Sequence, residues 1–272
     1  MKTLYLSDLD GTLLGSDGRI SKYSSEIINS FMQNGGYFSY ATARSVVSAE
    51  KTLVGLDICY PVICYNGTFI IDSITKEILF SCLFSSEEIK KVEQVLKENN
   101  INPIVYSYIN GKEKFSFVDN ISNPALQNYL NSRDNDPRRN ELQTADNLYD
   151  GNIFTFSCID DETKLLTVKS YFENDSRFRC IYQKEFYSGN YWFELYPNKA
   201  SKANAALELK DMLNCERLIV FGDNINDIPM FDVADEGYAV DNSANELKEV
   251  ATEIIDSNDN DAVARWIEKN LL

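Results

Sequence analysis

Two aspartates stand two residues apart directly after a short apolar segment. Asp8 and Asp10 follow residues 2–7, which we predict to form a buried strand that ends in a polar loop. One carboxylate of such a pair can attack phosphorus, while the other donates a proton to the leaving oxygen and later activates water. An Asp-rich turn is the alternative for an Asp-x-Asp pair alone, but the whole string from Asp8 to Thr12 is far rarer and favours catalysis.

A second acidic string follows another apolar segment near the C-terminal end. Asp223, Asn226 and Asp227 come after residues 217–221, which we also predict to be a strand. Because the carboxyl ends of parallel strands meet at one edge of a sheet, both acidic strings should emerge together. Three or four crowded carboxylates require a hard divalent cation, and Mg2+ is the natural candidate. A turn rich in Asn and Asp is the alternative interpretation.

A threonine and a lysine form a third candidate element. Thr42 follows the strand predicted for residues 37–41, and Lys202 lies in the first turn of a helix that we expect to begin at Ser201. A lysine in the first turn opposes the helix dipole, which is mildly unfavourable unless an anion lies nearby. This position therefore hints at bound phosphate, and an ordinary solvated lysine is the alternative.

The residue types that the chain lacks narrow the chemistry further. It contains no histidine, which excludes a Ser-His-Asp triad, an HExxH zinc site and a phosphohistidine mechanism. No cysteine is followed six positions later by arginine, so the loop of the cysteine-dependent phosphatases is absent too. If the chain is an enzyme, carboxylates must do the chemistry.

Strands and helices alternate in both terminal parts of the chain, and this alternation predicts a parallel sheet. With 272 residues the chain is long enough for two domains. We expect a discontinuous core domain of residues 1–83 and 189–272 and an inserted α+β domain of residues 84–188. The polar stretch 131–147 is interpreted as a solvated loop, with a basic functional patch as the weaker alternative. The inserted domain is predicted to contain helices at 86–99 and 161–173 and strands at 114–118 and 152–158.

The composition is that of a soluble globular protein with an acidic surface. Hydrophobic residues make up 44% of the chain, and 42 Asp and Glu against 26 Lys and Arg give a net charge of -16. This charge repels nucleic acid and anionic membranes, so neither is expected as a partner, and a phosphate site needs a metal ion or clustered cations. Because no signal peptide, membrane-spanning run or disulfide-like cysteine spacing is found, we expect a cytoplasmic protein with reduced cysteines. We also expect a monomer or a weak homodimer.

Together the motifs resemble those of the haloacid dehalogenase (HAD) superfamily, most closely its Cof-type sugar-phosphatase branch. Departures are small, such as Ala43 in place of the usual glycine before Arg44, and concern substrate contacts more than the reaction. The matching positions run in order through the whole chain, as Asp8 to Leu14, Thr42 with Arg44, Asn66 with Gly67, Ser201 with Lys202, and Gly222 to Asp227.

The resemblance implies an α/β fold, namely a Rossmann-like parallel-sheet core with an inserted α+β cap domain of the C2B type. It implies that Asp8 attacks in line and that Asp10 is the general acid and base. It also implies that Mg2+ binds the Asp8 carboxylate, the Asp10 backbone carbonyl and Asp223. Phosphate contacts are implied for Thr42, Lys202 and Asn226, and supporting or substrate contacts for Asp227, Arg44 and Asn66.

The implied activity is Mg2+-dependent hydrolysis of a small phosphorylated metabolite, with sugar phosphates expected first, through an aspartyl-phosphate on Asp8. A phosphomutase would share that intermediate. A non-catalytic protein that binds a phosphorylated ligand is disfavoured, because binding alone would not need Asp10. The cap would recognise the organic part of the substrate. Tyr187, Tyr191 and Trp192 are candidates for lining that pocket, and burial in a core is the favoured alternative.

Overall fold

Strand β1, Thr3–Ser7, lies inside a five-stranded parallel sheet with the order β14-β13-β12-β1-β2. The computed structural model describes residues 1–118, 123–184 and 190–272. They divide into two compact units, one formed by Met1–Ser81 with Ala200–Leu272 and one formed by Cys82–Lys199. The parallel sheet is the centre of the first, discontinuous unit, which confirms the α/β core expected from the sequence.

The elements of the first unit alternate between strand and helix on both sides of the insertion. Before the insertion they are β1, α1 (Lys22–Gln33), β2 (Tyr37–Tyr40), α2 (Val46–Glu50), β3 (Val62–Cys64), β4 (Phe69–Ile71) and β5 (Ile78–Ser81). After it they are α6 (Lys202–Met212), β12 (Arg217–Gly222), α7 (Ile228–Asp232), β13 (Glu236–Val240), α8 (Asn245–Val250), β14 (Glu253–Ile255) and α9 (Ala262–Leu271).

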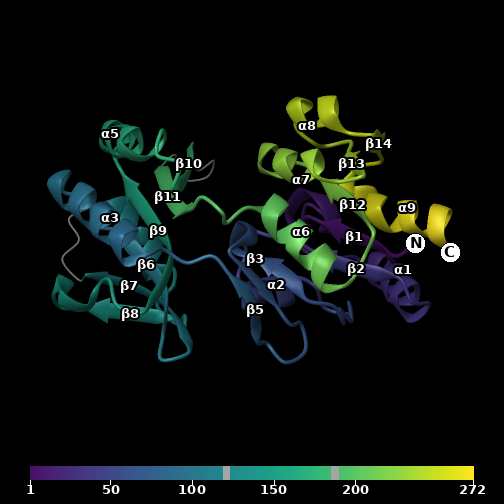
Figure 1. Cartoon of the computed structure of the whole chain (residues 1–272), viewed down its shortest axis with the longest axis horizontal. Helices are drawn as coiled ribbons and strands as arrows, with labels where there is room; N and C mark the ends of the chain where they lie inside the picture. Colours follow the sequence, from purple (N-terminus) through teal and green to yellow (C-terminus); the bar gives the residue numbers. More distant parts are fainter. Residues whose placement is uncertain (119–122, 185–189) are drawn as a thin grey trace. The chain divides into compact units, whose positions relative to one another are not determined.

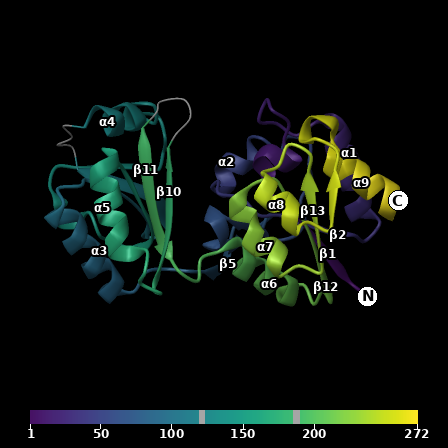
Figure 2. The same ribbon diagram turned by 90° about the horizontal axis from the view of Figure 1, so that it is seen from above.

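Helices cover both faces of the parallel sheet (Figures 1 and 2). Leu4 and Leu6 of β1 are buried in a cluster that includes apolar residues of α6, α7 and α8. The ring of Tyr5, between them, lies on the other face, 5.3 Å from that of Phe31 in α1 and 6.1 Å from that of Trp266 in α9. Because both faces are packed, the strands are apolar on both sides, and polar groups can gather only beyond the strand ends.

A small antiparallel sheet, β3-β4-β5, extends from the edge of the parallel one. Ala41, directly after β2, forms an isolated parallel bridge with Ile63 of β3. The short helical turn Tyr65–Gly67 then connects β3 with β4. The turn therefore lies close to the residues that follow β2.

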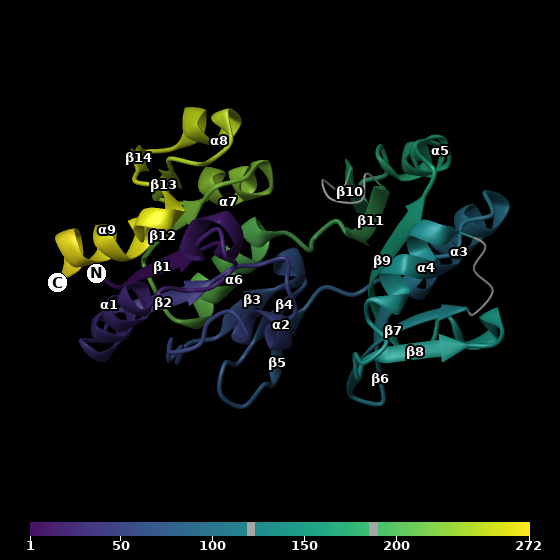
Figure 3. The same ribbon diagram turned by 180° about the vertical axis from the view of Figure 1, so that it is seen from behind.

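The inserted unit is built on a six-stranded sheet with the order β10-β11-β9-β6-β7-β8 (Figure 3). All neighbouring strands are antiparallel except β7 and β8, which are parallel. The elements are α3 (Ser86–Glu98), β6 (Ile104–Ile109), β7 (Lys112–Val118), α4 (Pro124–Asn131), β8 (Arg139–Leu142), β9 (Asn152–Asp160), α5 (Glu162–Phe172), β10 (Phe178–Lys184) and β11 (Tyr191–Pro197).

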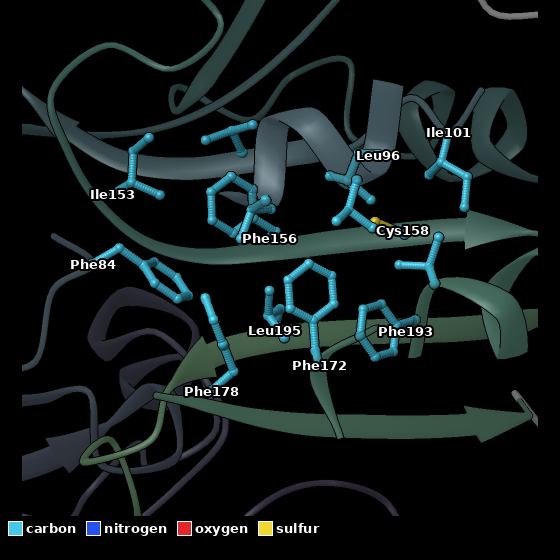
Figure 4. Close-up of a cluster of buried hydrophobic side chains, with 14 of the residues drawn as sticks. Phe84, Leu96, Ile101, Ile153, Phe156, Cys158, Phe172, Phe178, Phe193 and Leu195 are labelled. Carbon is cyan, nitrogen blue, oxygen red and sulfur yellow. The ribbon is translucent and has the colours of Figure 1, made fainter. Parts of the chain in front are cut away.

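A separate apolar core stabilises this unit, where α3 and α5 pack on one face of the sheet (Figure 4). Leu96 of α3 and Phe172 of α5 are fully or almost fully buried against Phe156 of β9 and Phe193 of β11. Both helices begin and end within a residue of the predicted bounds, and α3 begins where Ser85 forms a hydrogen-bonded capping box with Glu88.

The boundaries of the compact units differ from those expected at 83/84 and 188/189. The first division falls between Ser81 and Cys82, and the second falls after Lys199. The second lies later than expected because β11 pairs with β9 and β10 and so belongs to the inserted unit. Residue 188 itself lies outside the described residues. That the two units are separately folding domains stays a prediction.

The expected solvated loop at 131–147 is wrong in part, because Arg139–Leu142 form strand β8, which pairs with β7. Next to it, the Arg138 guanidinium donates to the Glu113 carboxylate at 2.6 Å and to the Asp136 carboxylate at 2.7 Å. Neighbouring carboxylates therefore balance this positive charge, and a basic functional patch gains no support.

Four of the six cysteines are buried, while Cys59 is exposed and Cys180 half-buried. Among the residues that the structure describes, no helix has both the length and the apolar composition needed to span a bilayer.

Candidate active site

The ends of β1 and β12 lie side by side and bring the two acidic strings together. Ser7 pairs with Phe221 in the sheet, and the Asp8 amide donates to the Phe221 carbonyl at 2.9 Å. Across this edge, Thr12 Oγ1 donates to Asp223 Oδ1 at 2.9 Å. Carboxylates from opposite ends of the chain thus meet at one edge of the sheet, where the parallel arrangement predicts them.

Gly11 lets the chain turn tightly against Asp223. Its φ is +77°, and a Cβ atom at this position would lie 2.4 Å from Asp223 Oδ2. The turn is held from outside as well, because Asn242 Nδ2 donates to the Gly11 carbonyl and Asn258 Nδ2 to the Leu14 carbonyl, both at 2.8 Å. These contacts themselves were not expected from the sequence, although Asn242 and Asn258 stand at positions that also resemble the Cof-type branch.

Lys202 lies between two carboxylates. Ser201 caps α6 by accepting the Asn204 amide, and Lys202, predicted in the first turn of this helix, is its first residue. Its Nζ lies 2.7 Å from Asp8 Oδ1 and 2.7 Å from Asp227 Oδ1, and the residue is only 3% exposed. Burial alone lowers the pKa of Lys202, but Asp227 and Asp8 outweigh it and raise the pKa above its ordinary value. The solvated-lysine interpretation is therefore wrong.

Asp227 has hydrogen-bond donors at both oxygens. Oδ1 accepts from Lys202, and Oδ2 accepts from the backbone amides of Asp223 and Asn224 at 3.1 Å each. Asp227 is fully buried at the start of α7. It therefore orients the lysine and the turn after β12, and its oxygens have less capacity left for a further ligand.

The carboxylates at this edge suit a hard divalent cation. Oxygens of Asp8, Asp223 and Asp227 lie within 4.8 Å of one another. Burial raises the pKa of Asp8 well above its ordinary value although Lys202 opposes the shift, and Asp227 adds repulsion. Burial and Asp227 likewise raise the pKa of Asp223 to about 6. One ammonium does not balance three carboxylates, so a cation bound here would stabilise their charged forms.

Thr42 and Arg44 are held against the turn Tyr65–Gly67. Thr42 is fully buried; its carbonyl accepts the Asn66 amide at 2.9 Å, and its Oγ1 accepts the Arg44 amide at 3.1 Å. The turn contains three consecutive residues with positive φ, which is uncommon for the two that are not glycine: 51° at Tyr65, 53° at Asn66 and 91° at Gly67. Asn66 therefore supports the end of β2 through its backbone amide, which binds the Thr42 carbonyl.

Gly67 connects this turn with α6. A Cβ atom on Gly67 would lie 2.1 Å from the Ser201 carbonyl oxygen and 2.8 Å from the Lys202 amide nitrogen. No side chain fits in this space, because both neighbours are backbone atoms at the start of the helix. The position of Lys202 therefore depends on the absence of a side chain at residue 67.

Replacing Gly67 by alanine is expected to lower the free energy of unfolding by about 2–4 kcal/mol, from the backbone clash together with the positive φ. To relieve the clash, the backbone at the start of α6 would have to move, which would displace Lys202 and lower activity. Gly35→Ala is the matched control, because Gly35 also has positive φ (88°) but no atom within 4 Å of an added Cβ. Urea unfolding of both variants checks the prediction. A Gly67 variant no less stable than the Gly35 variant would contradict it.

The structure places Asp10 and Arg44 together, outside the buried acidic cluster. Arg44 Nε donates to Asp10 Oδ2 at 2.7 Å, and a second guanidinium nitrogen of Arg44 donates to Oδ1 at 2.5 Å. The Asp10 side chain is 51% exposed and the Arg44 side chain 28%. Asn226 is exposed in the turn Ile225–Asp227. The sequence predicted Asp10 and Arg44 as site residues but not their ion pair.

The aromatic residues near the end of the inserted unit are partly buried. Tyr191 packs against the apolar core of this unit, its ring stacked 5.9 Å from that of Tyr182. Trp192, on the neighbouring position of β11, meets the ring of Tyr129 edge-on at 4.8 Å. Packing thus accounts for both, and Tyr187 lies outside the described residues.

Comparisons with known proteins agree over the whole length of the chain. A family model described as haloacid dehalogenase-like hydrolase matches residues 5–267. The 5-amino-6-(5-phospho-D-ribitylamino)uracil phosphatase YwtE of Bacillus subtilis (strain 168) is 28% identical, over 97% of this chain and 96% of its own. The pyridoxal phosphate phosphatase YbhA of Escherichia coli (strain K12) is 24% identical, over 97% of each chain.

The fold comparison gives the same result. The crystal structure of a haloacid dehalogenase-like hydrolase from Bacteroides thetaiotaomicron matches with a TM-score of 0.76 and 25% sequence identity, over 99% of both chains.

Proposed function

Because the chain belongs to the haloacid dehalogenase-like hydrolase family and is a phosphatase of that family, we propose that it hydrolyses small phosphorylated metabolites with the help of Mg2+. The observation that carries this proposal is the cluster of Asp8, Asp223 and Asp227 with Lys202. Two of these acids hold the lysine, and the carboxylates would also hold a divalent cation, so that lysine and cation together could neutralise the charge of a phosphate ester.

Asp8 is the nucleophile in this mechanism. Its carboxylate attacks phosphorus, the bond from phosphorus to the leaving oxygen breaks, and that oxygen takes its electron pair and a proton from Asp10. Water then attacks the aspartyl-phosphate and gives a proton to Asp10, and the bond from phosphorus to Asp8 breaks to release inorganic phosphate. Lys202 holds one Asp8 oxygen at 2.7 Å, so the other oxygen is the one that attacks.

Thr42, Lys202 and Asn226 are proposed to contact the transferring phosphoryl oxygens. The cation ligands would be the Asp8 carboxylate, the Asp10 backbone carbonyl and Asp223, because Asp227 already accepts hydrogen bonds at both oxygens. Mg2+ in that position would supply positive charge near the phosphate oxygens. Positioning and charge neutralisation together must lower the barrier by on the order of 20 kcal/mol, because phosphate monoesters hydrolyse very slowly in water.

Sugar phosphates are the first substrates to test. The names of the two related phosphatases give a phosphorylated ribitylamino-uracil for one and pyridoxal phosphate for the other, so relatives differ in the organic part that they accept. A phosphorylated ribityl chain resembles an open sugar phosphate, which supports the choice. A cytoplasmic location and the lack of nucleic-acid and membrane partners stay predictions.

Release of inorganic phosphate from a panel of sugar phosphates, pyridoxal phosphate and p-nitrophenyl phosphate tests the function. We expect turnover with Mg2+ and none after chelation with EDTA. Equal turnover in EDTA would contradict the metal requirement. An isomerised sugar phosphate without free phosphate would identify a phosphomutase instead.

Mg2+ is also expected to stabilise the protein in the absence of substrate. At a hundred times its dissociation constant, the ion should raise the free energy of unfolding by about 2.7 kcal/mol, because it binds only the folded arrangement of Asp8 and Asp223. Thermal unfolding with Mg2+ and with EDTA measures the effect. Asp223→Asn removes one charged ligand at almost constant shape, so its unfolding temperature should respond much less. An identical response in the variant would place the ion elsewhere.

A further inference from the structure

The ion pair between Arg44 and Asp10 has a geometry that a surface salt bridge does not need. Two guanidinium nitrogens of Arg44 bind both oxygens of Asp10, at 2.7 and 2.5 Å, so the plane of the carboxylate is fixed. Both side chains are partly exposed, so solvent screens the attraction, while the two parallel hydrogen bonds still fix the orientation of the carboxylate. The pair is therefore better explained by what it does to Asp10.

The backbone around Arg44 is held in place at two points. Thr42 Oγ1 accepts the Arg44 amide, and the Arg44 carbonyl accepts the Tyr65 amide at 3.1 Å. Tyr65 adopts a φ of 51°, a conformation that is rare for a bulky side chain. A strained conformation of this kind persists only where the surrounding structure enforces it, and such residues are concentrated at functional sites. Here the strained turn fixes the residue that carries the guanidinium.

A carboxylate bound in this way can still accept a proton. Each of its oxygens has two acceptor positions, and the guanidinium fork occupies one on each. Asp10 can therefore take a proton from the attacking water, or approach a leaving oxygen, without losing its orientation. A freely rotating carboxylate on an exposed loop would meet the reacting atoms only part of the time.

We propose that Arg44 is the positioning residue for Asp10, and that its bidentate guanidinium aims the carboxylate at the leaving oxygen and the attacking water. This rests on the proposed function. In this role, Arg44 influences catalysis only by orienting Asp10. If Arg44 instead bound the phosphate directly, its contribution to catalysis would not depend on Asp10. A lysine cannot replace it, because an ammonium is a point charge without the planar fork.

A double-mutant cycle on the full-length enzyme with Mg2+ tests the proposal. p-Nitrophenyl phosphate is the substrate, because its good leaving group keeps Asp10→Asn measurable. Arg44→Gln and Arg44→Lys are each expected to lower kcat by roughly 10- to 100-fold with KM changed less than about twofold. In the Asp10→Asn background, the same substitutions should change kcat by less than about twofold, because the group that Arg44 orients is already gone.

Each contrary result has its own meaning. A further tenfold loss on adding Arg44→Gln to Asp10→Asn, a raised KM with unchanged kcat, or full activity in Arg44→Lys would overturn the positioning role. Wild-type enzyme without phosphatase activity would overturn the proposed function as well. Unfolding curves with and without Mg2+ serve as the control for folding, because Arg44 lies outside the acidic cluster and its variants should keep the wild-type response.

Discussion

Asparagine in place of Asp8 is expected to remove phosphatase activity while the protein stays folded. The amide has nearly the shape of the carboxylate but is not a nucleophile, and its oxygen can still accept the hydrogen bond from Lys202. Loss of a covalent nucleophile should lower kcat on the order of 10⁴-fold or more. Stability should not fall, because the substitution removes one of three mutually repelling carboxylates.

Steady-state assays with sugar phosphates and p-nitrophenyl phosphate measure the loss, and urea unfolding measures the stability. Asp232→Asn is the matched control, since Asp232 is an exposed aspartate at the end of α7, outside the cluster. It should keep wild-type activity. Turnover of the Asp8 variant within a few fold of wild type would rule out an aspartyl-phosphate at this residue.

Methionine in place of Lys202 is the change with the largest expected effect on stability. Lys202 is almost completely buried and contacts two carboxylates at 2.7 Å, so its removal leaves Asp8 and Asp227 without their shared cation. Removing one partner of a buried ion pair typically lowers the free energy of unfolding by about 3–5 kcal/mol. Activity should be lost too, because the attacking carboxylate is no longer held and the transferring phosphate loses a positive charge.

Urea unfolding at neutral pH in EDTA measures this loss. Lys210→Met, in the last turn of the same helix, is the control and should change stability by less than about 1 kcal/mol. The double variant Lys202→Met with Asp227→Asn should be more stable than the sum of the single effects predicts, because the second change removes a carboxylate that has lost its partner. If the free energy of unfolding of Lys202→Met equalled that of the wild type, the lysine would not balance these charges.

The convergence of the acidic strings could be predicted from the sequence for a simple physical reason. Apolar segments before Asp8 and before Asp223 indicated two strands, and the alternation of strands and helices indicated that they are parallel. Parallel strands place their carboxyl ends at one edge, so the sequence alone predicts that the two strings meet. Ser201 as the cap of α6 is likewise a local property, readable from a few neighbouring residues.

Contacts between distant side chains could not be predicted in this way. The sequence indicated that Lys202 opposes its helix dipole, but not that its ammonium lies between Asp8 and Asp227. It named Arg44 and Asp10 without their pairing, and it assigned 131–147 to a loop although β8 forms there. The pairing of β11 with β9 and β10 also moved the boundary of the inserted unit.

By itself, the sequence determined the residue types, their order and the strand ends at which they stand, because hydrophobic periodicity and capping depend on neighbours within a few positions. Only the tertiary structure decided which oxygen faces which nitrogen. That choice depends on helix packing, on side-chain rotamers and on close backbone approaches such as Gly67 against Ser201, where residues far apart in the chain share the same few ångströms.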